Sequence, residues 1–197
     1  YYSKILLSNW FKFKKSYAQH AEDELIEMLF PAGVKSFIDI GANDGVLFSN
    51  TYKFAKKKAR GLCIEPSKNC FFKLRLNHLW HFKVTCLNLA ISDSAKSLFL
   101  QEYGYENVLS KITTNKEKNV TCIKADTLDG VLNRHPKLEH PDLVSIDVEG
   151  HESEVLDGAI NTLPEAGIII LEIDKLNTDK ILKKPALFRH LPAYSNG

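Results

Sequence analysis

The feature that most constrains the fold is a series of short apolar runs, most of which end in an acidic residue. The runs read VKSFIDI, RGLCIEP, FKVTCLNLAIS, DLVSIDVEG and GIIILEID, and stretches with helical periodicity lie between most of them. Continuous apolar strands that alternate with helices are typical of a parallel sheet covered on both faces. The sequence therefore predicts an α/β fold built on such a sheet.

Length and composition indicate one soluble domain. The 197 residues are 44% hydrophobic and 25% charged, with a formal net charge of +2, which gives no reason to expect a nucleic-acid partner. No apolar run approaches the roughly 20 residues of a membrane span. We divide the chain into an amino-terminal extension with a lead-in helix, residues 1–30, and a main domain, residues 31–197.

The four cysteines and the amino-terminal run bear on location and partners. No two cysteines have a C-x-x-C spacing, so we expect reduced, buried thiols and a cytoplasmic location. The run NWFKFKKSY mixes aromatic and basic residues. It suits a membrane surface or nucleic acid, but we interpret it as a solvated extension and expect neither contact.

One segment breaks the alternation of strands and helices. Between Ser94 and Asp126 the runs KSLFLQEY, NVLS and NVTCIKA are typical of short strands, which predicts a β-rich insertion after the third strand. Beyond Asp174 no further strand is recognisable, and Pro185 and Pro192 interrupt the remaining residues. We expect a sheet that is truncated at this edge, naturally short or completed by a partner, and an exposed edge favours a homo-oligomer.

Polar residues end every predicted strand of the sheet. In open parallel sheets, ligands bind outside the carboxyl ends of the strands. Solvent exposure explains any one polar strand end but explains the whole set poorly. We therefore expect a ligand site there, formed from Asp39, Glu65, Ser92, Asp93, Asp147, Glu149, Glu172 and Asp174.

The loop GANDG after the first strand suggests a cationic nucleoside. Gly41 permits a tight turn, Gly45 lets a ligand approach the backbone, and Asn43 can adopt a left-handed conformation. The dinucleotide fingerprint G-x-G-x-x-G and a P-loop lysine are both absent from this loop. Asp39 and Asp44 would repel a pyrophosphate, whereas S-adenosylmethionine carries an ammonium and a sulfonium.

Glu65 completes this prediction. It follows the second strand and lies twenty residues after Gly45, a distance at which an acid binds the two hydroxyls of a ribose. A carboxylate accepts hydrogen bonds from both hydroxyls at once.

Five blocks together resemble the FkbM-type methyltransferase family. They are FIDIGANDGVLFSNT, GLCIEPS, NLAISD, DTLD and DLVSIDVEGHESEVLDGA, and SYAQHAEDELIEMLF looks like the lead-in helix of one branch. The resemblance covers roughly residues 16–174. It implies a class I methyltransferase fold, Rossmann-like, that uses S-adenosylmethionine to methylate hydroxyls, mostly on sugars or secondary metabolites.

The resemblance also implies roles for individual residues. Glu65 would bind the ribose, Ser92 and Asp93 would lie near the adenine edge, and Asp147 would close the site below the sulfonium. The methionine part would be held by the loop residues Asp39, Gly41, Ala42, Asn43, Asp44 and Gly45.

The segment DVEGHE supplies the candidate catalytic residues, which are Asp147, Glu149 and His151. A hydroxyl acceptor loses a proton, so a base is needed nearby. Asp147 and Glu149 would project to one side if the strand continued past them. A helix that starts at His151 would lower the pKa of that residue and keep it neutral.

Simpler roles stay open for these residues. His151 would then be an exposed first-turn residue, and Glu149 would only place negative charge at a helix start. Asp147, Glu149 and Glu172 would also suit a divalent cation, although we expect no metal.

Two functions remain open at this stage. The first is an O-methyltransferase for a small-molecule or glycan acceptor, acting on a hydroxyl of a sugar, a glycan or a secondary metabolite. The second is a catalytically inactive S-adenosylmethionine-binding or scaffold protein that keeps the fold, because fold alone does not establish turnover.

Overall fold

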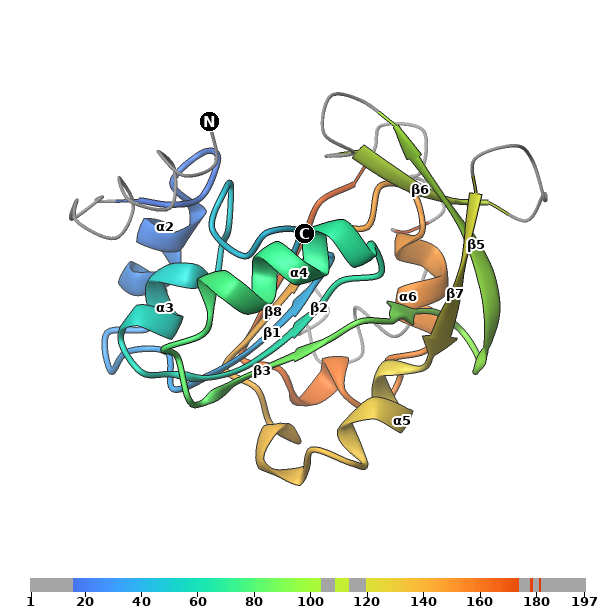
Figure 1. Cartoon of the computed structure of the whole chain (residues 1–197). Coiled ribbons are helices and arrows are strands. Elements are labelled where there is room, and N and C mark those ends of the chain that lie inside the picture. The colour runs from blue at the N-terminus through green and yellow to red at the C-terminus, as the bar shows by residue number, and fades with distance from the viewer. Residues whose placement is uncertain (1–15, 104–108, 114–119, 174–177, 179–180, 182–197) are drawn as a thin grey trace.

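The computed structural model describes residues 16–103, 109–113, 120–173, 178 and 181, and its core is a parallel sheet (Figure 1). The sheet has five strands in the order β3-β2-β1-β8-β9, and every neighbouring pair is parallel. The strands are β1 (Ser36–Ile40), β2 (Arg60–Ile64), β3 (Val84–Leu87), β8 (Leu143–Ile146) and β9 (Ile168–Leu171). The predicted parallel α/β sheet is confirmed.

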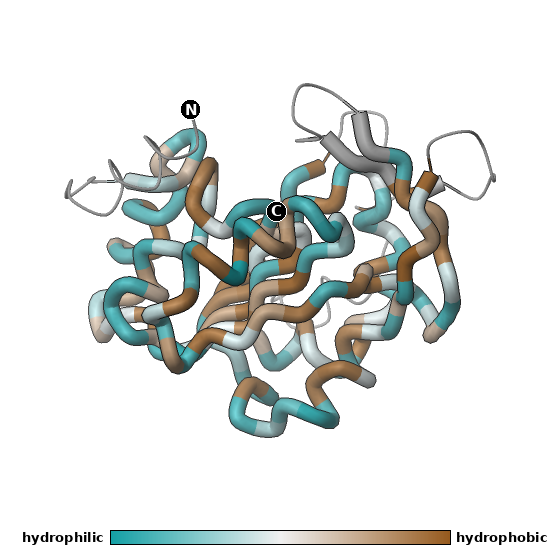
Figure 2. Tube along the Cα trace, in the orientation of Figure 1, coloured by the Kyte–Doolittle hydropathy of each residue, from teal (hydrophilic) through white to brown (hydrophobic). Residues whose placement is uncertain are grey.

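Side chains alternate between the two faces of this sheet along each strand, and both faces are buried. On β1, Phe37 packs in one cluster with Ile26 and Phe54. Ile38 and Ile40 point to the other face and pack in a second cluster. Figure 2 shows the sheet as a band of hydrophobic segments at the centre of the molecule. The continuous apolar runs are explained by burial on two sides.

Three helices lie over one face of the sheet, where Figure 1 shows them side by side. They are α2 (Glu22–Leu29), α3 (Tyr52–Lys56) and α4 (Lys68–Asn77). Ser67 caps the start of α4, because its hydroxyl oxygen accepts the backbone N–H of Cys70 at 3.3 Å. At the start of α3, Thr51 occupies the cap position but makes no capping hydrogen bond with its side chain. Ser49 still contributes, because its hydroxyl accepts the backbone N–H of Tyr52 at 3.1 Å.

The other face of the sheet carries shorter helical segments. They are α5 (Leu128–Leu132), α6 (Glu152–Asp157) and the 3₁₀ turns η2 (Pro136–Leu138) and η3 (Leu163–Glu165). Val131 of α5, Val155 of α6 and Leu163 of η3 all pack in the cluster that contains Ile38. Helices on both faces, as predicted, therefore enclose the sheet.

The predicted third strand is wrong in one respect, because it is divided between two sheets. The strand β3 ends at Leu87, and β4 (Ala90–Ile91) pairs with β7 in a second sheet. Between them the Asn88 side-chain amide donates to the carbonyl oxygens of Glu65 and Pro66 at 2.8 and 3.0 Å. These long-range hydrogen bonds hold the chain as it leaves the first sheet, and an apolar run does not reveal them.

The β-rich insertion is confirmed as this second, four-stranded sheet, in the order β4-β7-β5-β6. Its further strands are β5 (Lys96–Tyr103), β6 (Leu109–Thr113) and β7 (Val120–Asp126). Ala90, Leu98, Leu100, Ile123 and Ala125 form a small hydrophobic core of its own. In Figure 1 this sheet stands beside α6, at one end of the parallel sheet.

The lead-in helix packs against the main domain. Ile26 of α2 is buried in the same core as Phe37, and Glu27 forms an ion pair with Lys53 of α3 at 2.6 Å. The division at residue 30 stays a prediction. The run that contains Trp10 and the tail with two prolines lie outside the described residues.

Two further expectations concern the cysteines and the membrane. All four cysteines are free. Cys63 and Cys70 are buried as predicted, but Cys86 is only partly buried and Cys122 is exposed on β7. Among the described helices, none has the length and apolar character needed to cross a bilayer.

Candidate active site

The loop after β1 is shaped by residues with positive φ angles. Gly41 has φ +83°, and a Cβ atom there would overlap the carbonyl oxygen of Asp147. Gly45 has φ +77°, and a Cβ there would collide with Leu74 of α4. Asn43 has φ +49°, so the predicted left-handed conformation is confirmed. The loop therefore lies too close to the end of β8 and to α4 for side chains at either glycine.

Glu65 is fixed at the end of β2 by two backbone groups. The N–H of Asn43 donates to its Oε2 at 2.9 Å, and the N–H of Ser67 donates to its Oε1 at 2.8 Å. The residue is only 5% exposed, yet it lines a cavity. A carboxylate oxygen has more than one acceptor site, so a ligand hydroxyl can share an oxygen of Glu65 with these N–H groups.

The cavity at Glu65, here called the Glu65 cavity, lies between the two sheets. Gly41 and Asn43 form one side of it, next to Glu65. Leu100 and Ile112, from β5 and β6 of the second sheet, also line it. Further apolar surface comes from Ile40, Ile64, Leu89, Ala90, Ile91 and Val148. The pocket therefore combines apolar surface with the fixed carboxylate of Glu65, and Asp147 and Glu149 also line it.

A second cavity, here called the acidic cavity, lies on the other side of the loop. Five carboxyl-bearing residues line it, from the start of α2 and the carboxyl ends of β1, β8 and β9: Glu22, Asp39, Asp147, Glu149 and Glu172. Gly41, Asn43, Asp147 and Glu149 line both cavities. The two cavities therefore share a wall that contains two of the predicted catalytic residues.

Burial and mutual repulsion set the protonation of the acidic cavity. Burial raises the pKa of Asp39 to about 6, although the Thr51 hydroxyl donates to it at 2.6 Å. Burial also raises the pKa of Asp147 to about 7, and the neighbouring charges of Glu172, Glu149 and Asp39 contribute. Glu172, which lines the same cavity, is one of the neighbouring acids that raise the pKa of Asp147. Asp147 therefore holds a proton near neutral pH and sits beside a group that can share it.

The chain does not continue as a strand through Asp147 and Glu149. The strand β8 ends at Ile146, and Glu149 and Gly150 turn the chain with φ +51° and φ +99°. The expectation that strand alternation aligns the two acids is therefore wrong, because a tight turn into α6 intervenes. Both side chains still border the shared wall.

The remaining loop residues differ in their contacts. Ala42 lines the acidic cavity. Asp44 is buried, and its Oδ1 accepts the N–H groups of Val46 and Leu47, each at 2.8 Å. Asp44 is not among the residues that line either cavity, and neither is Gly45. Asp44 therefore stabilises the turn at Val46 and Leu47, at the end of the loop.

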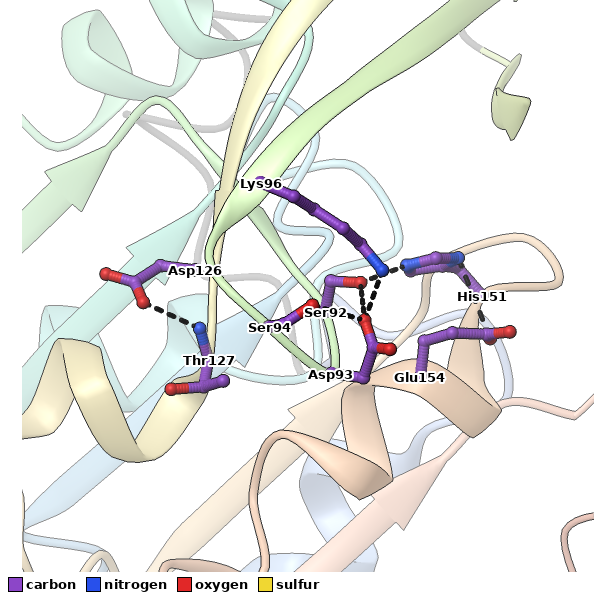
Figure 3. A network of polar contacts seen from close by, with 8 residues as sticks. All are labelled: Ser92, Asp93, Ser94, Lys96, Asp126, Thr127, His151 and Glu154. Carbon is purple, nitrogen blue, oxygen red and sulfur yellow. Dashed lines mark hydrogen bonds and ion pairs between the residues drawn. The ribbon is translucent and has the colours of Figure 1, made fainter. Parts of the chain in front are cut away.

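Ser92, Asp93 and His151 belong to a separate polar network (Figure 3). His151 Nε2 lies 3.0 Å from the Ser92 hydroxyl, which donates to Asp93 at 2.9 Å. Lys96 bonds to Asp93 and holds its pKa at about 2. The pKa of His151 is lowered, as predicted, but the main cause is burial and not the start of a helix. None of the three side chains lines the cavities, and their roles stay predictions.

Several residues on the cavity walls were not anticipated. Gln19 and His20, just before α2, line the acidic cavity, as do Asn50 and Ser145. The Asn50 amide donates to the Ser145 hydroxyl at 3.1 Å. The serine inside the otherwise apolar run DLVSID was the available signal for this position. Nothing in the sequence marks Leu100 or Ile112 as cavity residues.

A metal site has no support in the described part of the chain. There, no group of three or more His, Cys, Asp or Glu residues has an arrangement suited to a metal ion.

The fold and the site together define a class of protein. A parallel sheet in the order β3-β2-β1-β8-β9, a glycine loop after β1 and an acid after β2 are typical of Rossmann-like proteins that bind a nucleoside. Residues 39–194 match the Methyltransferase FkbM domain. The chain belongs to this family, and it is a methyltransferase of the kind that depends on S-adenosylmethionine.

Known relatives agree with this assignment. The chain is 26% identical over 174 residues to the hexuronic acid methyltransferase AglP of Haloferax volcanii, and the match covers 84% of this chain and 70% of AglP. The structure resembles precorrin-6y C5,15-methyltransferase from Geobacter metallireducens with a TM-score of 0.50 at 16% identity, over 88% of this chain and 73% of the other. This second likeness shows the fold alone.

A third relative shares the family name. Methyltransferase FkbM from Methylobacillus flagellatus matches with a TM-score of 0.45 at 16% identity, over 67% of this chain. The chain spans only 30% of the length of that protein.

Proposed function

We propose that the protein transfers a methyl group from S-adenosylmethionine to a hydroxyl of a sugar, a glycan or a secondary metabolite. One observation carries this proposal: the Glu65 cavity and the acidic cavity share a wall that contains Asp147 and Glu149. A pocket suited to a nucleoside thus adjoins a pocket with candidate bases. The named substrate class of AglP, a hexuronic acid, supports a sugar acceptor.

The residues present fit S-adenosylmethionine. Glu65 has fixed carboxylate oxygens for ribose hydroxyls. Leu89 and Ile91 offer apolar surface for an adenine ring. Gly41 lets the loop lie against the end of β8, because a Cβ there would overlap the Asp147 carbonyl, and Gly41 lines both cavities.

The acidic cavity favours the positive charge of the cofactor. When bound, S-adenosylmethionine supplies an activated methyl group on a cationic sulfur. Asp39 and Asp147 both line the cavity. Burial raises the pKa of both residues, and neighbouring acids raise that of Asp147 further. A cation beside them lowers those pKa values and favours the ionised forms.

Asp147 is the residue best suited to accept the hydroxyl proton. A general base works best when its pKa lies near the working pH, and the pKa of Asp147 is raised to about 7. A carboxylate oxygen of Asp147 would take the proton, and the neighbouring charges of Glu172 and Glu149 would keep the pKa of Asp147 raised. Glu149, on the shared wall, would assist by position. His151 remains a predicted base with no described contact to either cavity.

The proposal is tested by binding first and by transfer second. Isothermal titration should detect the binding of S-adenosylmethionine. If folded protein gave no heat of binding at millimolar cofactor, the assignment of the cofactor pocket would be rejected. Methyl transfer is then measured with radiolabelled cofactor and a panel of neutral sugars, hexuronic acids and hydroxylated metabolites. Binding without transfer to any member of the panel would favour the inactive scaffold. A cytoplasmic location stays a prediction.

A further inference from the structure

The helix α4 carries apolar side chains on two faces, although only one face packs against the sheet. Leu74 is buried in the core beneath α4, and Cys70 on the same helix is also buried. Phe72 and Leu76 point the other way and are 65% and 45% exposed. Packing of α4 against the sheet therefore does not explain why Phe72 and Leu76 are apolar.

The exposed apolar surface continues past the end of α4. Leu79, Trp80 and Phe82 are 59%, 63% and 87% exposed. The rings of Trp80 and Phe82 pack edge to face with centroids 6.4 Å apart. Residues four apart on a helix share a side, so Phe72 and Leu76 extend towards this group. We call the five residues Phe72, Leu76, Leu79, Trp80 and Phe82 the aromatic patch.

A positively charged cavity adjoins the aromatic patch. It lies at the amino-terminal ends of β2 and β3 and is lined by Arg60, Lys83, Arg134, His135 and Lys137, among others. Lys83 directly follows Phe82 in the chain. Arg134 pairs with Asp126 at 2.7 Å. For Arg60, Lys83 and Lys137, no side-chain ion pair with another described residue is present. We call this the basic cavity.

The surroundings of the aromatic patch are also basic. Residues 66–92 contain no aspartate or glutamate. Lys68 and Arg75 of α4 are exposed, as is Lys83. Contact between two copies of this surface would bring like charges together, which argues against a symmetric dimer here.

We propose that the aromatic patch and the basic cavity together dock the protein on an anionic lipid membrane. Tryptophan and phenylalanine insert at the boundary between headgroups and acyl chains. Nearby lysine and arginine side chains attract anionic headgroups, and the basic cavity accepts a headgroup phosphate. An exposed apolar cluster beside cations that form no ion pair with a described residue fits an anionic lipid surface better than it fits water.

This inference goes beyond the methyl-transfer reaction and does not depend on it. It departs from the expectation of no membrane contact, which considered only the amino-terminal run. The basic cavity lies at the amino-terminal ends of β2 and β3, whereas the Glu65 and acidic cavities lie at the carboxyl ends of the strands. Docking would therefore leave the candidate active site open to solvent.

Trp80 provides a specific probe of the contact. The chain has two tryptophans, Trp10 and Trp80, so a Trp10→Phe variant reports on Trp80 alone. With phosphatidylcholine vesicles that contain phosphatidylglycerol, Trp80 emission should shift to shorter wavelength, and brominated acyl chains should quench it. Pure phosphatidylcholine should give much weaker binding. Vesicle binding without a change at Trp80 would overturn the proposal, because another segment would then make the contact.

Matched variants separate the two parts of the surface. In flotation assays, Lys83→Glu should weaken partition by about fivefold or more, since each cation near an anionic surface contributes on that scale. Trp80→Ala with Phe82→Ala should weaken it by at least a similar factor. The controls are Lys124→Glu, which changes an exposed charge on β7, and Met28→Ala, which removes a side chain 79% exposed on α2. Equal losses in controls and test variants would overturn the proposal, as would binding of a DNA duplex in preference to anionic vesicles.

Discussion

Glu65 and Asp147 are two acids at the ends of strands that flank β1, and their surroundings differ in kind. Glu65 receives a backbone N–H on each oxygen, so its position is fixed by the main chain. Asp147 faces Glu172, Glu149 and Asp39, and its pKa rises to about 7. The first carboxylate suits recognition of neutral hydroxyls, whereas the second suits the uptake and release of a proton.

A substitution that distorts the loop after β1 should have the largest effect on stability. In Gly41→Ala the new Cβ would overlap the Asp147 carbonyl, so we expect a loss of about 3 kcal/mol or more in the free energy of unfolding. Urea denaturation measures it.

Gly33→Ala is the matched control for that variant. Gly33 has a similar φ of +77° but nothing within 4 Å of an added Cβ, so only the conformational cost of about 1 kcal/mol is expected. Equal destabilisation in the two variants would show that the close approach to Asp147 has no importance.

Removal of the proton acceptor should affect turnover more than binding. Asp147→Asn keeps the size of the side chain and removes its basicity, so kcat should fall by about 10²- to 10⁴-fold. Initial rates at saturating cofactor measure this, with titration for the cofactor Kd. Glu165→Gln, an exposed acid paired with His140, should leave kcat unchanged. An unchanged kcat in Asp147→Asn would transfer the role to Glu149 or His151.

The fixed acid should show the reverse pattern. Glu65→Gln retains the shape but weakens hydrogen bonds to a charged group, so affinity for S-adenosylmethionine should fall by about ten- to a hundredfold. Isothermal titration measures the Kd, and kcat at saturating cofactor should change little. Unchanged affinity would refute the ribose role of Glu65.

A smaller effect is expected in the pH dependence of the free energy of unfolding, which reports on Asp39 and Asp147. The folded-state pKa values of Asp39 and Asp147 are raised to about 6 and about 7, so the folded protein binds protons more tightly than the unfolded chain. Their stabilising contribution is therefore complete below about pH 4 and is lost as the pH rises through 6 and 7. Chemical denaturation between pH 4 and 8 measures this loss, which Asp147→Asn should reduce.

Cofactor affinity should change in the opposite direction. A cationic ligand prefers ionised acids, so the Kd for S-adenosylmethionine should fall by several-fold between pH 5.5 and 8. Titrations at the two pH values test this. A Kd that is independent of pH would mean that the cation does not approach Asp39 or Asp147.

Removal of divalent metal should have the smallest effect of all. The described residues offer no suitable group of ligands, so EDTA should leave the rate of methyl transfer unchanged. A loss of activity that Mg²⁺ restores would instead assign the acids around Asp147 to a cation.

The sequence predicted what local chemistry determines. Apolar runs located the strands of the parallel sheet, and Asn43 took the left-handed conformation expected of it. Glu65 was placed correctly at the end of β2, beside a cavity, because strand ends in a parallel sheet meet at one edge.

The sequence did not predict what distant contacts decide. Asn88 ends β3 early through hydrogen bonds to the main chain after β2. His151 turns towards Ser92, which is 59 residues away in the chain. Asp44 bonds to its own loop, and a loop acid gives no sign of whether it faces a ligand or the backbone.

The position of Leu100 and Ile112 has a consequence for how this enzyme could diversify. These two side chains bring the insertion into the Glu65 cavity, while the glycine loop and Glu65 belong to the parallel sheet. Substitutions in the hairpin of β5 and β6 can therefore reshape the part of the Glu65 cavity that these two residues line and leave the parallel sheet intact. Relatives with the same scaffold would be free to acquire new preferences through that hairpin alone.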